Sequence, residues 1–367
     1  SSLVLMRYIV EKVGLPAYGV WALVSVFTGY VALLDFGIGS SYVKYIAEHH
    51  ARDEADEMSS VVTTGLAFYA VFALAIIALG WPCLDWAIAG FVRLQAWRGH
   101  PAPASATLAD IRFLLRWGLV LFGASNCLAA FTSIQTGMQR MGLTNIISFF
   151  VSLLKIVATI FFLERGHGVR GLLYTNGLTL AAFGLASVAA AFWLAPSLRI
   201  TPRHLRLTTL SKLFSFGWRA QVSRLANLIM FETDKVVVGA VFSQLGLVAL
   251  YELGINMANK MRQIPALLVS ALVPAASDLD AREEHTLLQQ LYMVSTKYVS
   301  AVTIPLALLT AASAGIIMRT WMGEKPGIDL AAGVLRIIAI GYVANVVPGA
   351  GMSIALGKGR ADIFMKA

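Results

Sequence analysis

Long apolar runs, separated by short polar breaks, dominate the pattern of this chain. A helix needs about 20 predominantly apolar residues to cross a bilayer, and the runs reach that length. After a partial first helix, the pattern predicts nine full spans, at about 17–47, 57–80, 110–135, 143–163, 169–194, 212–242, 247–275, 288–320 and 330–356. We therefore expect an all-α, polytopic membrane protein.

The pattern of spans is incomplete at both ends of the sequence. Only a short apolar-leaning stretch precedes Glu11, too few residues for a span, so we interpret it as the end of a first helix. At the other end, the short basic loop at 357–360 leads into an apolar stretch that stops at Ala367. We expect the chain to be truncated at both ends.

Two polar segments orient the spans. The segment Trp81–Ala109 contains prolines and tryptophans among charges, which predicts an interfacial helix rather than a span. The most basic loop lies near the middle of the chain and contains Arg199, Arg203, Arg206 and Lys212. Because cytoplasmic loops carry an excess of Lys and Arg, we place this loop in the cytoplasm and the interfacial segment outside.

Composition narrows the class of protein. Of the 367 residues, 58% are hydrophobic and 13% are charged, whereas a soluble protein carries about 25% charged residues. The net charge is +9, but the cations lie between apolar runs. That placement favours a membrane surface and an anionic ligand over nucleic acid. Cys83 and Cys127 match no metal or redox spacing, so neither a metal site nor a cofactor is expected.

One short segment recurs along the chain. The sequence AEHHARDEA (47–55) lies over SDLDAREEH (277–285) without a gap, and each copy follows one long apolar helix and precedes another. A membrane chain built from two like halves is typical of carriers with a site between the halves. We divide the chain at the basic loop into an N-terminal helical lobe, residues 1–200, and a C-terminal helical lobe, residues 201–367.

Polar side chains inside the spans are the candidate site. Such residues are costly in hydrocarbon and face a cavity or a partner, and helical spacing places several of them on common faces. In the span 17–47, for example, Trp21, Ser25, Thr28 and Asp35 align. The candidates for a substrate-binding cavity are Arg224, Lys155, Lys260, Arg219, Arg262, Asn145, Asn227, Asn256, Asn259 and Gln263.

Two other roles compete with the cavity role. Stripes of Ser and Thr commonly serve close helix–helix packing, and Asp234 beside Lys235 could form a structural ion pair. Asp35 precedes Gly37 and Gly39, so three roles stay open for it: pairing with a cation, binding a coupling ion, or capping a helix bend. We group Asp35, Asp234 and Glu252 as candidates for ion coupling or a helix bend.

Several stretches resemble one known family. They are VGLPAYGVWALV, LLDFGIGSSYVKYIAE, TDKVVVGAVFSQLGLVALY and QIPALLVSALVPAASDL. The chain resembles the polysaccharide repeat-unit flippases (O-antigen or exopolysaccharide, Wzx-type), which share a superfamily with lipid II flippases and multidrug and toxin extrusion proteins. The resemblance implies two pseudo-symmetric six-helix lobes around a central cavity.

The resemblance also implies a function. Such a transporter flips an isoprenoid-pyrophosphate-linked oligosaccharide across the bacterial inner membrane by alternating access, for surface polysaccharide biosynthesis. Arginine and lysine in the cavity would offset the charge of the pyrophosphate, and Asn and Gln would bind the sugars. The implied partners are this lipid-linked oligosaccharide, membrane lipids, and assembly proteins such as a polysaccharide polymerase.

Three rival functions remain. A lipid II flippase carries the same kind of head group, and a cation-coupled multidrug exporter has the same fold but favours an acid-rich cavity. A membrane-embedded polysaccharide polymerase or ligase belongs to another class and needs acid–base groups at a water-facing site. The outer segment Trp81–Ala109 offers only Asp85 and His100, with Asp110 at its edge. We therefore expect a transporter rather than an enzyme, with no catalytic residue.

Overall fold

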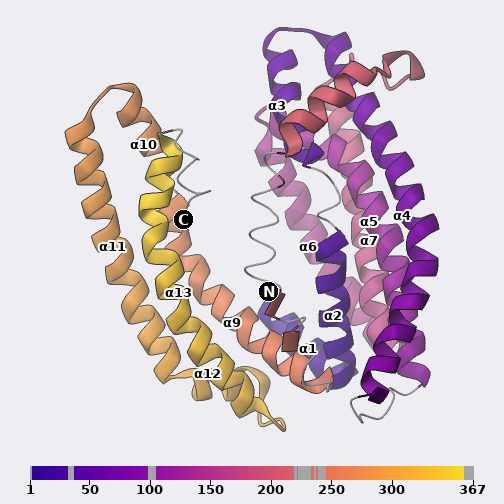
Figure 1. The fold of residues 1–367 in the computed structure, drawn as a ribbon, viewed down its shortest axis with the longest axis vertical. Coiled ribbons are helices and arrows are strands. Elements are labelled where there is room, and N and C mark those ends of the chain that lie inside the picture. The colour runs from indigo at the N-terminus through magenta and orange to yellow at the C-terminus, as the bar shows by residue number, and fades with distance from the viewer. Residues whose placement is uncertain are drawn as a thin grey trace. The chain divides into compact units, whose positions relative to one another are not determined.

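The computed structural model describes residues 2–31, 37–97, 105–218, 221, 233–234, 237–238, 245–270 and 272–358. Over these ranges the chain is helical with short connecting turns and contains no strand (Figure 1). The chain divides into two compact units. The first unit is Tyr8–Gly246, and the second combines Leu247–Ala367 with Ser1–Arg7. The lobe boundary expected near residue 200 stays a prediction.

The first unit is a bundle of long helices. Within it α4 packs on α5, α5 packs on α7, and α6 packs on α7, while α3 lies against both α4 and α5. Figure 1 shows α4, α5 and α7 running side by side. The helices are α1 (Ser2–Val13), which belongs to this unit from Tyr8 onward, α2 (Leu15–Val31), α3 (Ile38–Ala51), α4 (Ala55–Trp97), α5 (Ser105–Gly137), α6 (Met141–Glu164) and α7 (Gly168–Leu194), followed by the short η2 (Pro202–His204). Residues 207–218 are also helical.

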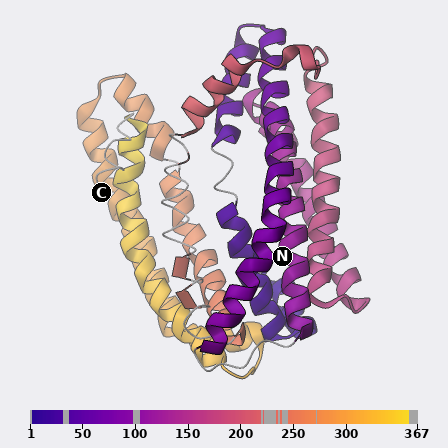
Figure 2. The ribbon, with the colours of Figure 1, turned by 45° about the vertical axis from the view of Figure 1, so that its right-hand side comes forward.

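The second unit is built on two long helices that run side by side, α11 and α13 (Figures 1 and 2). The shorter α10 and α12 both pack against α13. The bounds are α9 (Leu245–Ser270), α10 (Leu272–Ala281), α11 (His285–Ala312), α12 (Ala314–Met322) and α13 (Ile328–Gly357).

Within the described residues, six helices are long and apolar enough to cross a membrane. At most a third of the most apolar window of each is buried inside the protein, and large side chains such as Phe149, Phe150 and Leu185 are exposed. A water-soluble bundle would bury these faces, so they are the faces that contact lipid. The six spans are Ala55–Gly90, Thr107–Gly137, Met141–Glu164, Gly168–Leu194, His285–Ala312 and Ile328–Ala355. The protein is therefore an all-α, multi-pass membrane protein, as the hydropathy pattern predicts.

The predicted interfacial helix is wrong in one respect. The segment that begins at Trp81 is no separate helix, because α4 continues through Pro82 to Trp97. Proline removes only one backbone donor from the helix, and side-chain contacts hold the extension in place. Asp85 of α4 accepts hydrogen bonds from Arg112 and Arg116 of α5, at 2.9 and 2.5 Å.

Two predicted spans are also divided. The span 288–320 is broken at Ser313, which ends α11 and precedes α12. The span 17–47 becomes α2 and α3, and α3 begins after Gly37, whose φ is +72°. Glycine adopts this left-handed conformation without steric cost, and a side chain there would collide with the backbone of Gly217. Ser41 then anchors α3 by donating a 2.7 Å hydrogen bond to the carbonyl of Leu213.

Candidate functional site

A polar cluster joins α9 and α13 in the second unit. The hydroxyl of Tyr342 donates a 2.6 Å hydrogen bond to Oδ1 of Asn259. One turn further along both helices, Nη1 of Arg262 donates to Oδ1 of Asn345 at 3.3 Å. The guanidinium of Arg262 also lies 5.1 Å from the centre of the Tyr342 ring, within cation–π range. The cluster therefore holds the side chain of Arg262 in one position between two mostly apolar helices, α9 and α13.

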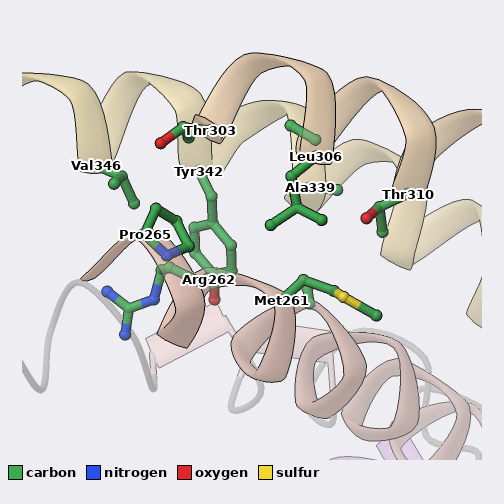
Figure 3. A pocket seen from close by; sticks show the side chains of 11 residues that line it. Met261, Arg262, Pro265, Thr303, Leu306, Thr310, Ala339, Tyr342 and Val346 are labelled. Atoms are coloured by element: carbon green, nitrogen blue, oxygen red, sulfur yellow. The ribbon is translucent and has the colours of Figure 1, made fainter. Parts of the chain in front are cut away.

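A small cavity adjoins this cluster. Its lining comes from α9, α11 and α13 and includes Arg262, Thr303 and Tyr342 (Figure 3). The cavity volume is about 20 Å³, which is room for a single water and too little for a substrate. Oγ1 of Thr303 is buried and has no hydrogen-bond partner among the described residues, so a water in this cavity would satisfy it. None of the residues described around the cavity carries a carboxylate.

The other candidates on α9, which are Glu252, Asn256, Lys260 and Gln263, divide into hydrogen-bonded residues and residues nearer the surface. Asn256 donates from Nδ2 to Oε1 of Glu252 at 2.8 Å, so both side chains are engaged within the helix. Lys260 is half-buried and Gln263 is exposed. The structure thus brings Asn259 and Arg262 together with α13 and leaves Lys260 and Gln263 toward the surface of the unit.

Five polar residues of α6 follow helical spacing and form a stripe that lies mostly on the outside of the first unit: Asn145, Ser148, Ser152, Lys155 and Thr159. Asn145, Ser148, Ser152 and Lys155 are all exposed, and Lys155 makes no ion pair with the residues that the structure describes. Thr159, at the end of the stripe, is buried and donates a 2.7 Å hydrogen bond to the carbonyl of Lys155. Helix packing inside the unit therefore accounts for Thr159 but not for the four residues before it.

A larger pocket lies inside the first unit, among α2, α5 and α7. Its cavity volume is about 450 Å³, within the range of about 300–1,000 Å³ that small-molecule sites occupy. The lining combines apolar side chains with Trp21, Ser25, Ser125 and Asn176, and includes no charged residue. The side-chain amide of Asn176 makes no hydrogen bond to the described part of the chain. The pocket therefore suits a neutral ligand with hydroxyl groups.

Comparison with known proteins decides the family. The family profile described as polysaccharide biosynthesis protein matches residues 2–280, more than half of the chain. The chain belongs to this family. It is 20% identical over 368 residues to a Shigella flexneri protein named as an O-antigen transporter, covering 97% of this chain and 81% of that protein. The suspected relationship to Wzx-type flippases is confirmed.

Solved structures confirm the fold of this family member. An inward-facing multidrug resistance MATE family transporter of the MOP superfamily superposes with a TM-score of 0.76 at 16% identity, over 97% of this chain and 81% of that one. The Vibrio cholerae MATE transporter VcmN, in its bent form, gives a TM-score of 0.57 at 17% identity, over 100% and 87%. A MOP superfamily transporter from Pyrococcus furiosus gives 0.54 at 17%, over 98% and 82%. The expected MATE-like fold is therefore confirmed.

Several predicted site residues of this family member lie outside the described residues. They are Asp35, Arg219, Arg224 and Asn227, and their roles stay predictions. Asp234 is described and is half-buried. Pattern reasoning found Trp21 and Ser25 as aligned residues but missed Ser125 and Asn176, because single polar residues in apolar helices resemble ordinary packing positions. It also missed Tyr342 and Asn345, the partners of Asn259 and Arg262.

Proposed function

We propose that this family member flips an isoprenoid-pyrophosphate-linked oligosaccharide from the cytoplasmic to the periplasmic leaflet of the bacterial inner membrane, by alternating access between two lobes. The family match and the relative named as an O-antigen transporter support this proposal. The observation in the structure that carries it is the fixed arginine of the second unit, Arg262, held between Tyr342 and Asn345.

The chemistry of Arg262 suits a pyrophosphate. A guanidinium is always charged, is less strongly hydrated than an ammonium, and can donate two parallel hydrogen bonds to one phosphate. The Tyr342 ring and the Asn345 amide hold it in one orientation, which lowers the entropy lost when it binds a ligand. Moving an anionic head through a layer of low dielectric is costly without such a cation.

A second cation, Lys155, lies in the first unit. It lies on an exposed polar stripe of a helix that otherwise presents large apolar residues. A polar stripe of this kind is unfavourable against lipid and favourable against a water-filled cavity. We propose that Lys155 and Arg262 both line the path of the pyrophosphate, together with Lys260 and the undescribed Arg219 and Arg224.

The pocket of the first unit suits the sugars of the same cargo. Sugars are neutral and rich in hydroxyl groups, and they bind best where a flat aromatic face lies beside amide and hydroxyl groups. Trp21, Asn176 and Ser125 supply these groups in the 450 Å³ pocket. Among the candidates named from sequence, Asn256 and Asn259 are already engaged within their own unit, so this pocket is the better site for sugars.

The rivals fit the described residues less well. A multidrug exporter that carries cations needs exposed acids, but Glu252 is engaged with Asn256 in α9. A polymerase or ligase needs an acid–base pair at a water-facing site, but Asp85 and Asp110 both pair with arginines. We propose that the protein carries out no covalent chemistry, and that its cargo is pyrophosphate-linked.

Reconstitution tests the proposal directly. The full-length protein would be placed in liposomes that contain a pyrophosphate-linked isoprenoid oligosaccharide, and an impermeant hydrolase would be added outside. We expect the hydrolase to consume the inner-leaflet lipid as well as the outer-leaflet lipid only in protein-containing liposomes. A cationic dye serves as the comparison cargo. Transport of the dye without movement of the lipid would overturn the flippase and favour the exporter.

A further inference from the structure

The loop between α7 and the helix at 207–218 has a composition that the transport cycle does not explain. We call residues 195–218 the basic segment. It contains Arg199, Arg203, Arg206 and Lys212, together with His204, and not a single Asp or Glu. It begins one residue after the span Gly168–Leu194 ends, so it starts at the membrane surface.

Hydroxyl groups at the start of α4 hold the basic segment in place. The backbone N–H of Arg199 donates to Oγ of Ser59 at 3.1 Å, and the N–H of Arg206 donates to Oγ1 of Thr64 at 3.1 Å. Oγ1 of Thr64 in turn donates to the carbonyl of His204 at 3.3 Å. Both Ser59 and Thr64 are buried. The segment is therefore fixed to the first unit along one side and has a defined outer side.

The outer side carries three cations that no acid among the described residues neutralises. Arg206 pairs with Glu57, and His204 lies 3.8 Å from Asp56. Arg199, Arg203 and Lys212 are exposed and form no ion pair within the described ranges of the chain. These three exposed cations lie within one segment that contains no Asp or Glu, whereas Arg52 and Arg282 in other loops pair with acids.

Large apolar side chains alternate with these cations. Trp193 is 73% exposed, Leu207 is 84% exposed and Trp218 is 62% exposed, and Leu205 between them is 47% exposed. In water such exposure is unfavourable. At the edge of a bilayer it is favourable, because tryptophans and leucines insert at the boundary between head groups and acyl chains while cations stay among the head groups.

We propose that the basic segment is a binding site for anionic phospholipid head groups. Arg199, Arg203 and Lys212 contact the lipid phosphates, and Leu207 and the two tryptophans insert beside them. A nucleic acid would match the charge but would leave the leucines and tryptophans in water. Because hydrogen bonds to Ser59 and Thr64 fix the segment to α4, lipid bound here would hold this part of the first unit at the membrane surface.

Lipid titration tests the site in the full-length protein. Binding of phosphatidylglycerol and of phosphatidylcholine to the purified protein would be measured by native mass spectrometry in detergent. The test variant is the triple substitution Arg199→Gln, Arg203→Gln and Lys212→Gln. A cation at an anionic surface contributes enough that losing three should weaken phosphatidylglycerol binding about a hundredfold. Phosphatidylcholine binding should hardly change, because that lipid has no net charge.

A matched control separates the site from net charge. The triple variant Arg52→Gln, Arg282→Gln and Arg319→Gln removes the same charge from arginines that already pair with Glu48, Asp278 and Asp329. It should bind phosphatidylglycerol as the unmodified protein does. A further variant, Leu205→Ser with Leu207→Ser, should weaken binding of both lipids.

Two results would overturn the proposal. One is equal phosphatidylglycerol affinity in the Arg199, Arg203 and Lys212 variant and in the unmodified protein, at equal folding by size-exclusion profile. The other is competition by inorganic phosphate at the same concentration as the lipid, which would mean a free-anion site rather than a lipid site. Loss of phospholipid binding at this site would leave the flipping of lipid-linked oligosaccharide in liposomes unaffected. The phospholipid-site proposal and the flippase proposal can therefore fail independently.

Discussion

Asp53 and Glu283 share one left-handed backbone conformation at equivalent positions of the repeated segment, with φ of 58° and 57°. The arginine before each residue pairs with the acid four residues earlier, Arg52 with Glu48 at 3.1 Å and Arg282 with Asp278 at 3.0 Å. The same turn thus joins α3 to α4 and α10 to α11. The repeat found in the sequence is therefore also a repeat in local structure.

This turn leads to a prediction about stability. A left-handed conformation costs a non-glycine residue about 1–3 kcal/mol, least for Asp and most for β-branched residues. Glu283→Gly should therefore raise the thermal unfolding temperature of the full-length protein in detergent, and Asp53→Gly should raise it less. Glu283→Val should lower it. The control is Asp56→Val, which introduces the same β-branched side chain at an exposed helical position in the first turn of α4. Destabilisation by Glu283→Gly as large as that by Glu283→Val would contradict the explanation.

The extension of α4 beyond Pro82 gives a second prediction. Asp85 holds this part of the helix by bonding to Arg112 and Arg116 of α5. Asp85→Asn should loosen the helix after Pro82 and leave its start unchanged. Hydrogen–deuterium exchange should therefore become faster in residues 83–97 and not in residues 55–70. Asp56→Asn, at an exposed position of the same helix, is the matched control. Uniform faster exchange along α4 would mean general unfolding instead.

Apolar run length predicted most of the fold. Helices α5, α6, α7 and α13 follow the apolar runs of the sequence closely, because an apolar run in lipid can satisfy its backbone hydrogen bonds by forming a helix. Periodicity could not predict the continuation of α4, since that depends on ion pairs between Asp85 and arginines about 30 residues later. Hydropathy also treats a proline as a break, whereas a bilayer-spanning helix tolerates one.

The candidate site was predicted only in part, for a similar reason. The sequence named Asn259 and Arg262 separately as cavity candidates, and in the structure the side chains of both contact α13. Their partners Tyr342 and Asn345 lie 83 residues away in sequence, and no local pattern can choose them. Spacing on one helix shows which residues share a face, but only tertiary packing shows what that face meets.

Accessibility of α6 tests the water-filled path. In a background without Cys83 and Cys127, Lys155→Cys should react with a polar thiol reagent in native membranes. Leu153→Cys, on a neighbouring exposed position of α6, should not react, because we expect lipid around it. Ala158→Cys, which is buried, is a second unreactive control. Equal protection of positions 153 and 155 would remove Lys155 from the cavity.

Sidedness tests the two-lobe arrangement. Parallel repeats with six spans between them place the loops at His50 and His285 on the same side of the membrane. Tags inserted after these residues should both be protected in intact cells and both be accessible in inside-out vesicles. A tag after Glu324, between α12 and α13, should show the opposite pattern. Opposite sidedness of the first two tags would mean an inverted repeat.

Arg262 gives the sharpest test of the cargo. If it contacts pyrophosphate, its charge and its planar shape both contribute, so Arg262→Lys should keep part of the flipping activity and Arg262→Gln should lose it. Removing a charge-assisted contact costs on the order of 1.5–3 kcal/mol, or about tenfold to over a hundredfold in affinity. The measurement is hydrolase access to lipid-linked oligosaccharide in liposomes, normalised to reconstituted protein.

The partner tyrosine shows whether Arg262 acts on cargo or on folding. Tyr342→Phe keeps the ring beside the guanidinium but loses the hydrogen bond to Asn259, so it should cost about 1 kcal/mol of stability and leave flipping nearly intact. Arg262→Gln should show the reverse: a small change in unfolding temperature and a large loss of flipping. Arg319→Gln, which breaks a surface pair with Asp329, controls for charge. If Arg262→Gln flips lipid as well as the unmodified protein at equal abundance, the pyrophosphate contact must be assigned to other cations, and the cation-exporter alternative gains support.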